Sequence, residues 1–333
     1  MKWMVPDFYP AFSCTAEKCR HSCCIGWEVL IDPDSYRRYQ QSPYAEELLS
    51  GIELTEDGPA FRMDEQGRCA FLASNGLCRM MLTLGEDSLC QICADHPRFR
   101  SHFSTRTEVG LGLCCEEACR LLLTHREPLR LIVLQDDGRA ERRLPEEEAF
   151  FHRRSRLLRI IQNRRLPVHQ RLNRVLVVGG AALPRLTPKE WAKRLRGLER
   201  LDPSWDNALN LLALSPTGSA NALKGAEWET AFEQLALAFG YRHLAVSLTD
   251  GRFEERLAFA VQSVMLLRQI CLGYLSVHQD IRLEKLMEFS RQYSAEIEYS
   301  DVNLNAMLSW MVKEDADGLL RSKKRQMLRQ PCR

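Results

Sequence analysis

The sequence predicts a mainly α protein, in which a Cys-rich, metal-binding N-terminal unit with few short strands is followed by a helical domain. Two observations predict this division. Eleven of the 13 cysteines lie before residue 120, and from Glu146 onward apolar residues recur at helical spacing. A chain of 333 residues is long enough for two units. We expect a Cys-rich region over 1–125, a strand- or hairpin-like join over 126–145, and a helical domain over 146–333 that ends in a basic tail.

The composition excludes several classes of protein. The net charge is +2, so global charge indicates no polyanionic partner, and no nucleic-acid motif or aromatic interleaving accompanies the arginines. The apolar runs are shorter than the roughly 20 residues of a membrane span. The opening "MKWMVPDFYPAF" lacks the unbroken apolar core of a signal peptide. We therefore expect a cytoplasmic protein without structural disulfides, and the odd cysteine count agrees with that.

The cysteines of the N-terminal region are clustered, which buried thiols that only fill space would not be. The clusters read Cys14-x4-Cys19-x3-Cys23-Cys24, then Cys69 and Cys78, then Cys90-x2-Cys93, then Cys114-Cys115-x3-Cys119. Metal centres need three or four thiolates, which sequence-distant pairs supply once the chain folds. Asn75-Gly76 predicts a tight turn that brings Cys69 and Cys78 together. The spacing predicts a thiolate-ligated centre and leaves zinc and iron–sulfur both open.

The remainder of the chain predicts helices joined by short connections. Apolar periodicity indicates helices over 150–166, 188–201, 228–246 and 255–275, and Thr187-Pro188 is a start signal. The segment "PLRLIVLQDDGR" is the best strand candidate. Arginines are frequent over 139–174, where they indicate either an amphipathic surface helix or a docking face for an acidic protein.

Five segments resemble the flagellin lysine-N-methylase family. In the N-terminal region these are "FSCTAEKCRHSCCIGWEVLID", "CAFLASNGLCRMMLTLGEDSLCQICADHPRFR" and "EVGLGLCCEEACRLLL". In the C-terminal half they are "YRHLAVSLTDGRFEERLAFAVQSVMLLR" and "YSAEIEYSDVNLNAML". The N-terminal region is also similar to small iron- or zinc-chelating Cys domains, although Ala70 stands where those domains usually carry proline.

The resemblance implies an S-adenosylmethionine-dependent protein lysine N-methyltransferase that acts on flagellin and carries an iron–sulfur cluster, expected to be 4Fe–4S with zinc as the alternative. The implied metal ligands are Cys19, Cys23, Cys24, Cys69, Cys78, Cys90 and Cys93, with Cys14, Cys114 and Cys115 as further candidates. The alternative function is a non-enzymatic metal-binding or redox-sensing module. Which lysines are modified, and the oligomeric state, do not follow from the sequence.

Two further pairs of residues are candidates for the methyl-transfer chemistry. Gly110 and Gly112 form a short Gly-rich segment and are candidate cofactor-binding residues. The preceding "SHFSTRTE" is too polar for the apolar strand of a cofactor fingerprint, so a structural turn with close backbone packing is the competing interpretation. Lysine methylation needs a neutral amine, and Glu298 and Tyr299 lie in a segment of the family resemblance. They are the candidate catalytic residues, against the alternative of a solvated charged helix face.

Overall fold

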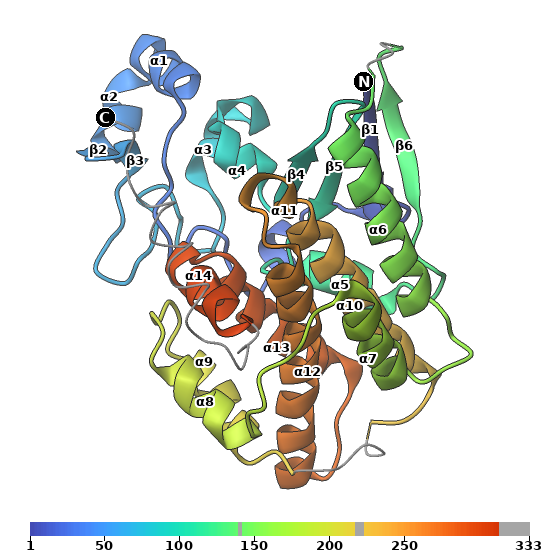
Figure 1. Ribbon diagram of the computed structural model, residues 1–333. Helices are drawn as coiled ribbons and strands as arrows, with labels where there is room; N and C mark the ends of the chain where they lie inside the picture. Colours follow the sequence, from blue (N-terminus) through green and yellow to red (C-terminus); the bar gives the residue numbers. More distant parts are fainter. Residues whose placement is uncertain (139–141, 217–222, 313–333) are drawn as a thin grey trace, which may run out of the picture.

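The computed structural model describes residues 1–138, 142–216 and 223–312, so the expected basic tail and Cys332 lie outside the described residues. The expectation of a mainly α protein is confirmed (Figure 1). The helices are α1 Pro33–Gln41, α2 Ala45–Ser50, α3 Arg79–Leu84, α4 Gln91–Asp95, α5 Glu116–Thr124, α6 Pro145–Ile161, α7 Val168–Gly179, α8 Pro188–Arg196, α9 Trp205–Ala213, α10 Ala226–Leu244, α11 Ser247–Asp250, α12 Phe253–His278, α13 Leu283–Tyr293 and α14 Asp301–Trp310.

Two small sheets lie in the N-terminal region. Strands β2 (Ile52–Thr55) and β3 (Gly58–Phe61) form an antiparallel pair beside α1 and α2 (Figure 1). The larger sheet has the order β4-β5-β1-β6, formed by Arg98–His102, Arg106–Leu111, Lys2–Pro6 and Leu131–Asp136. Strand β1 runs parallel to β5 and antiparallel to β6. The strand predicted within 126–145 is β6. Among the described residues it pairs with β1 at the start of the chain, and not with an adjacent strand in a hairpin.

The expectation that no strand precedes the Gly-rich segment was wrong. Strand β5 runs through Thr107, Glu108 and Gly110, and its residues from Thr107 to Leu111 are buried. The polar residues indicated an exposed segment, but the Glu108 side chain is buried and does not face water. Its carboxylate accepts hydrogen bonds from both Arg154 nitrogens at 2.8 and 2.6 Å. A paired buried carboxylate is compatible with a central strand, whereas an unpaired one is not.

The helical region is built around α10 and α12. Helix α12 lies at the centre of a large apolar core to which α5 to α10 and α13 contribute (Figure 1). It is long and apolar enough to cross a membrane, but 78% of its most apolar window is buried inside the protein, as in the core helix of a folded domain. The predicted start of α8 is confirmed. Thr187 and Glu190 form a capping box, in which the Thr187 side chain accepts from the Glu190 N–H.

Part of the arginine-rich segment is buried, which corrects the expectation of a surface helix or docking face throughout. Arg154 and Arg171 are only 2% and 1% exposed. Arg171 donates to Glu233 on α10, which is fully buried, and Arg164 donates to the same carboxylate at 2.9 Å. These pairs hold α7 and the segment between α6 and α7 against α10. Periodicity could not show this, because a charge is buried only where its partner meets it in the fold.

We predict that Arg171→Met destabilises the protein by about 3 kcal/mol or more, because it leaves Glu233 short of its buried cation. Arg164→Met is the matched control, since Arg164 is more exposed and its loss leaves the Arg171–Glu233 pair intact. Chemical denaturation of both variants measures the difference. Equal losses for the two variants would contradict this account.

Candidate functional site

Five predicted ligand cysteines gather in the core of the N-terminal unit. We call Cys24, Cys69, Cys78, Cys90 and Cys93 the thiol cluster. Cys69 and Cys90 are buried, and the other three are partly buried against the same apolar residues. The five thiols lie near enough to influence one another's ionisation. Residues up to 69 positions apart in the chain are thus collected at one place.

Short turns in the chain bring these thiols together. The Cys69 N–H donates to the Cys24 carbonyl at 2.9 Å, which joins the first cysteine segment to the second. The predicted turn at Asn75-Gly76 is confirmed, because the Gly76 N–H donates to the Ala73 carbonyl and Gly76 has a φ of 80°. After this turn, Cys78 forms an isolated antiparallel β-bridge with Leu72. Cys78 and Cys90 immediately precede α3 and α4.

Three sulfurs of the thiol cluster accept backbone N–H groups from residues two or three positions onward. The donors are Phe71 to Cys69, Met80 and Met81 to Cys78, and Ile92 and Cys93 to Cys90. Burial raises the pKa of Cys69 to about 11, and the N–H of Phe71 opposes this. The Cys93 thiol lowers the pKa of Cys90 against burial. Such N–H groups stabilise charge on sulfur, as a thiolate ligand requires.

The donor set suits a thiolate-ligated centre. It is rich in sulfur, shielded by apolar side chains, and supplied with backbone donors that favour the thiolate. Within residues 1–138, 142–216 and 223–312, no group of three or more Cys, His, Asp or Glu side chains has the spacing of a formed metal site. The fit therefore lies in the chemistry and location of the donors, not in a completed coordination shell.

The other predicted ligands lie outside the thiol cluster. Cys23 is exposed and hydrogen-bonded to the Cys24 thiol. Cys14 and Cys19 lie on the loop that reaches the start of α5, near Cys115. Cys114 faces His96 and Tyr299. The predicted set thus falls into separate groups, which spacing alone did not indicate.

The second candidate site surrounds Tyr299. We call His96, Cys114, Arg242, Glu298 and Tyr299 the tyrosine site. The Tyr299 hydroxyl is hydrogen-bonded to Cys114, whose sulfur is 3.9 Å from His96 Nε2. The Arg242 guanidinium lies 4.5 Å from the centre of the Tyr299 ring. His96, Cys114 and Tyr299 are each half-buried, so the site reaches the surface.

Glu298 is the buried anchor of the tyrosine site. It ends a π-helical turn, Ser294–Glu298, a type of irregularity that is frequent at functional sites. His243 Nε2 lies 2.6 Å and Arg242 Nε 3.4 Å from Glu298 Oε1. Burial opposes ionisation of Glu298, but Arg242 and then His243 outweigh it and lower the pKa to about 2. A carboxylate that binds protons so weakly is a poor general base near neutral pH.

His96 and Trp27 connect the two sites. The Trp27 ring packs against the core of the thiol cluster and lies 5.9 Å from the His96 ring, which is 6.2 Å from the Tyr299 ring. Burial, then the charges of Arg242 and Arg98, lower the pKa of His96 to about 4, so His96 is neutral at physiological pH. Sequence reasoning missed Arg242 and His243. The one sequence feature that could have indicated these two residues is their place in "YRHLAV", part of a segment that resembles the family.

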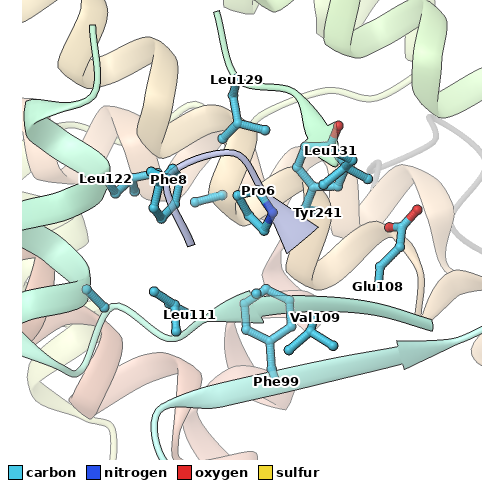
Figure 2. Close-up of a pocket in the computed structure, with 13 residues that line it drawn as sticks. Pro6, Phe8, Phe99, Glu108, Val109, Leu111, Leu122, Leu129, Leu131 and Tyr241 are labelled. Carbon is cyan, nitrogen blue, oxygen red and sulfur yellow. The ribbon is translucent and has the colours of Figure 1, made fainter. Parts of the chain in front are cut away.

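The two candidate glycines permit close packing. A Cβ at Gly112 would lie 2.1 Å from the Tyr299 hydroxyl, and one at Gly110 would lie 2.2 Å from the Phe99 ring. Both distances agree with the interpretation of close backbone packing. Gly110 also lines an apolar pocket between the larger sheet and helices α5 and α10, and Figure 2 shows the aromatic rings of Phe8, Phe99 and Tyr241 around it.

Comparisons with known proteins confirm the family resemblance. Over 134 residues, 38% of this chain, it is 26% identical to a lysine-N-methylase of Salmonella typhimurium and equally similar to that of Salmonella choleraesuis. The same share is 26% identical to a flagellar biosynthetic protein, FliU, of Salmonella muenchen. The match spans 33% of each lysine-N-methylase and 79% of the FliU protein. No family model and no solved structure matches the chain.

We predict that Gly112→Ala destabilises the protein by about 1–3 kcal/mol, because the added methyl group displaces the Tyr299 hydroxyl. Adding Tyr299→Phe removes that oxygen, so the double variant should recover part of the loss. Thermal unfolding of the single and double variants measures the coupling. Strictly additive losses would show that Gly112 and Tyr299 do not meet.

Proposed function

We propose that this protein is an S-adenosylmethionine-dependent protein lysine N-methyltransferase with flagellin as its substrate. The observation that carries the proposal is the adjacency of the two sites, in which Trp27 and His96 join a buried thiol cluster to a surface-reaching tyrosine site. The similarity to proteins named lysine-N-methylase supports the type of reaction. The cytoplasmic localisation expected from the sequence stays a prediction.

The thiol cluster is the proposed place of an iron–sulfur centre. Cys69, Cys78 and Cys90 would be its ligands because backbone N–H groups already point at their sulfurs, and Cys24 or Cys93 would complete the set. Such a centre, when bound, adds its binding free energy to folding of the N-terminal unit. Through Trp27, an ordered thiol cluster would hold His96 against the tyrosine site.

The apolar pocket of Figure 2 has a cavity volume of only about 30 Å³, room for little more than a water molecule, so it does not hold the adenosyl part of the cofactor as it stands. Cofactor binding near Gly110 and Gly112 therefore stays a prediction, in which aromatic side chains such as Phe99 would attract the cationic sulfonium. S-Adenosylmethionine, when bound, supplies a methyl group whose bond to sulfur breaks as the lysine nitrogen bonds to the methyl carbon.

The tyrosine site would prepare the lysine for this attack. The positive charge of Arg242 and partial burial disfavour a second cation nearby, so both lower the pKa of an entering lysine amine. The Tyr299 hydroxyl can accept a hydrogen bond from the neutral amine and orient its lone pair. Glu298, with its low pKa, keeps Arg242 and His243 in place and is a positioning residue in this proposal.

We predict that protein purified without oxygen contains iron and acid-labile sulfide. Cys69→Ser/Cys90→Ser should lose both, because it removes the two most buried thiolates of the cluster. Cys271→Ala is the matched control, since Cys271 is buried in α12 among apolar side chains. Metal and sulfide analysis measures the content. Stoichiometric zinc without sulfide would replace the iron–sulfur proposal, and full iron in the double variant would refute this ligand choice.

We predict that the purified protein, with S-adenosylmethionine and unmethylated flagellin, adds methyl groups to flagellin lysines. The rate should rise with pH as the reacting amine loses its proton, and level off below the ordinary lysine pKa of about 10.4 because Arg242 lowers the pKa of that amine. Tyr299→Phe should lower kcat at least about tenfold with little change in cofactor affinity. Tyr274→Phe, a change on α12 where the ring packs against His278 and Phe289, should leave kcat unchanged.

Mass spectrometry of flagellin and a binding titration with S-adenosylmethionine separate the outcomes. Equal loss of kcat and cofactor affinity in Tyr299→Phe would assign Tyr299 to the cofactor site or to folding. No methyl transfer by protein that holds its metal centre and binds the cofactor would remove the enzyme proposal. The alternative of a metal-binding or redox-sensing module would then account for the thiol cluster.

A further inference from the structure

A cavity of about 190 Å³ lies among α7, α10 and α12, and no described residue of the thiol cluster or the tyrosine site lines it. Its lining includes Val168, Leu223, Lys224, Glu229, Phe232 and Arg268. Glu229 lies in the first turn of α10 and Arg242 of the tyrosine site in its last turn, so about 20 Å of helix separates the two places. The proposed methyl transfer therefore gives this cavity no role.

Part of the lining is apolar, and the volume admits a small organic molecule. The Phe232 and Leu223 side chains are only 1% and 5% exposed, and the Phe232 ring stacks on Trp228 with 6.0 Å between the ring centres. A water molecule takes up about 30 Å³ of liquid volume, and a cavity of about 150 Å³ accommodates benzene. The space is thus sufficient for a molecule of roughly eight non-hydrogen atoms.

Glu229 places a negative charge at one side of the cavity. Its Oε2 accepts from the Val168 N–H and, at 3.2 Å, from Arg171 Nη2, which fixes the carboxylate at the start of α7. Within the described residues no hydrogen-bond donor reaches its other oxygen, Oε1. The Glu229 side chain is 35% exposed, so a ligand can reach Oε1.

Lys224 and Arg268 add positive charge from two other segments. Arg268 is half-buried on α12, and Lys224 is exposed just before α10. Burial lowers the pKa of Arg268, and the charge of Glu229 opposes that shift. A simple anion would be repelled by Glu229, and a simple cation by Arg268 and Lys224. A molecule that carries both charges suits both sides of the cavity.

We propose that this cavity binds a free α-amino acid with a small apolar side chain. The ammonium group would donate to Glu229 Oε1, and the carboxylate would accept from Arg268 and Lys224. The side chain would pack on Phe232 and Leu223. Charge-assisted hydrogen bonds are stronger than neutral ones, so the two charged ends supply most of the selectivity.

The test is isothermal titration calorimetry of the full chain with L-valine, whose size matches the cavity. One molecule should bind per chain, and binding should saturate. 3-Methylbutanoate, which lacks the ammonium group, and 2-methylpropylamine, which lacks the carboxylate, should each bind at least about tenfold more weakly. Equal affinity of L-valine and 3-methylbutanoate would overturn the assignment to an amino acid.

Glu229→Gln should lower the affinity for L-valine about 10–100-fold, because it removes the charge that pairs with the ammonium group. Glu227→Gln is the matched control. Glu227 lies in the same first turn of α10 but pairs with Arg126 at the surface and does not line the cavity, so this variant should bind L-valine as wild type does.

A second charge variant guards against misfolding. Lys224→Gln changes an exposed side chain and should lower the affinity about 3–10-fold, whereas Lys189→Gln, on α8 outside the cavity, should not. Unchanged affinity in both Glu229→Gln and Lys224→Gln would overturn the proposal. So would wild-type protein that shows no saturable binding of L-valine or L-leucine. These titrations use neither S-adenosylmethionine nor flagellin, so their outcome is independent of the proposed function.

Discussion

The buried pairing of Glu298 with Arg242 and His243 determines how the C-terminal helices meet the Cys-rich region. It joins the π-helical turn before α14 to the end of α10, and Arg242 extends from there over the rings of Tyr299 and Phe99. Removing Glu298 would leave Arg242 as an unpaired buried charge, which costs several kcal/mol. The position of the tyrosine site therefore depends on an ion pair within the helical domain.

A second buried ion pair joins the larger sheet to the helical domain. Arg154 of α6 binds Glu108 of β5, so the strand that leads into Gly112 is held against the helical domain. Gly112 can then approach Tyr299 closely, because it has no side chain to prevent it. Two ion pairs and one glycine thus align Cys114, His96 and Tyr299, residues that come from both halves of the chain.

The thiols fall into two classes according to the hydrogen bonds and the burial of their sulfur atoms. In the thiol cluster and at Cys115, backbone N–H groups point at sulfur and favour the charged form. The Cys119 thiol instead donates a hydrogen bond to the Leu113 carbonyl, and Cys271 is surrounded by apolar side chains, where burial raises its pKa. The first arrangement suits metal ligation, and the second suits a thiol that packs as a small apolar residue.

The sequence by itself determined helices α6, α8, α10 and α12, the capped start at Thr187, the turn at Asn75-Gly76 and the concentration of thiols, because periodicity, capping and turn chemistry are local. The tertiary structure decided how the cysteines are grouped, that Arg154 and Arg171 are buried, and that a polar segment forms a central strand. It also placed Arg242 and His243 beside Glu298. Each of these outcomes depends on a partner distant in sequence, and burial of a charge is favourable only where that partner arrives.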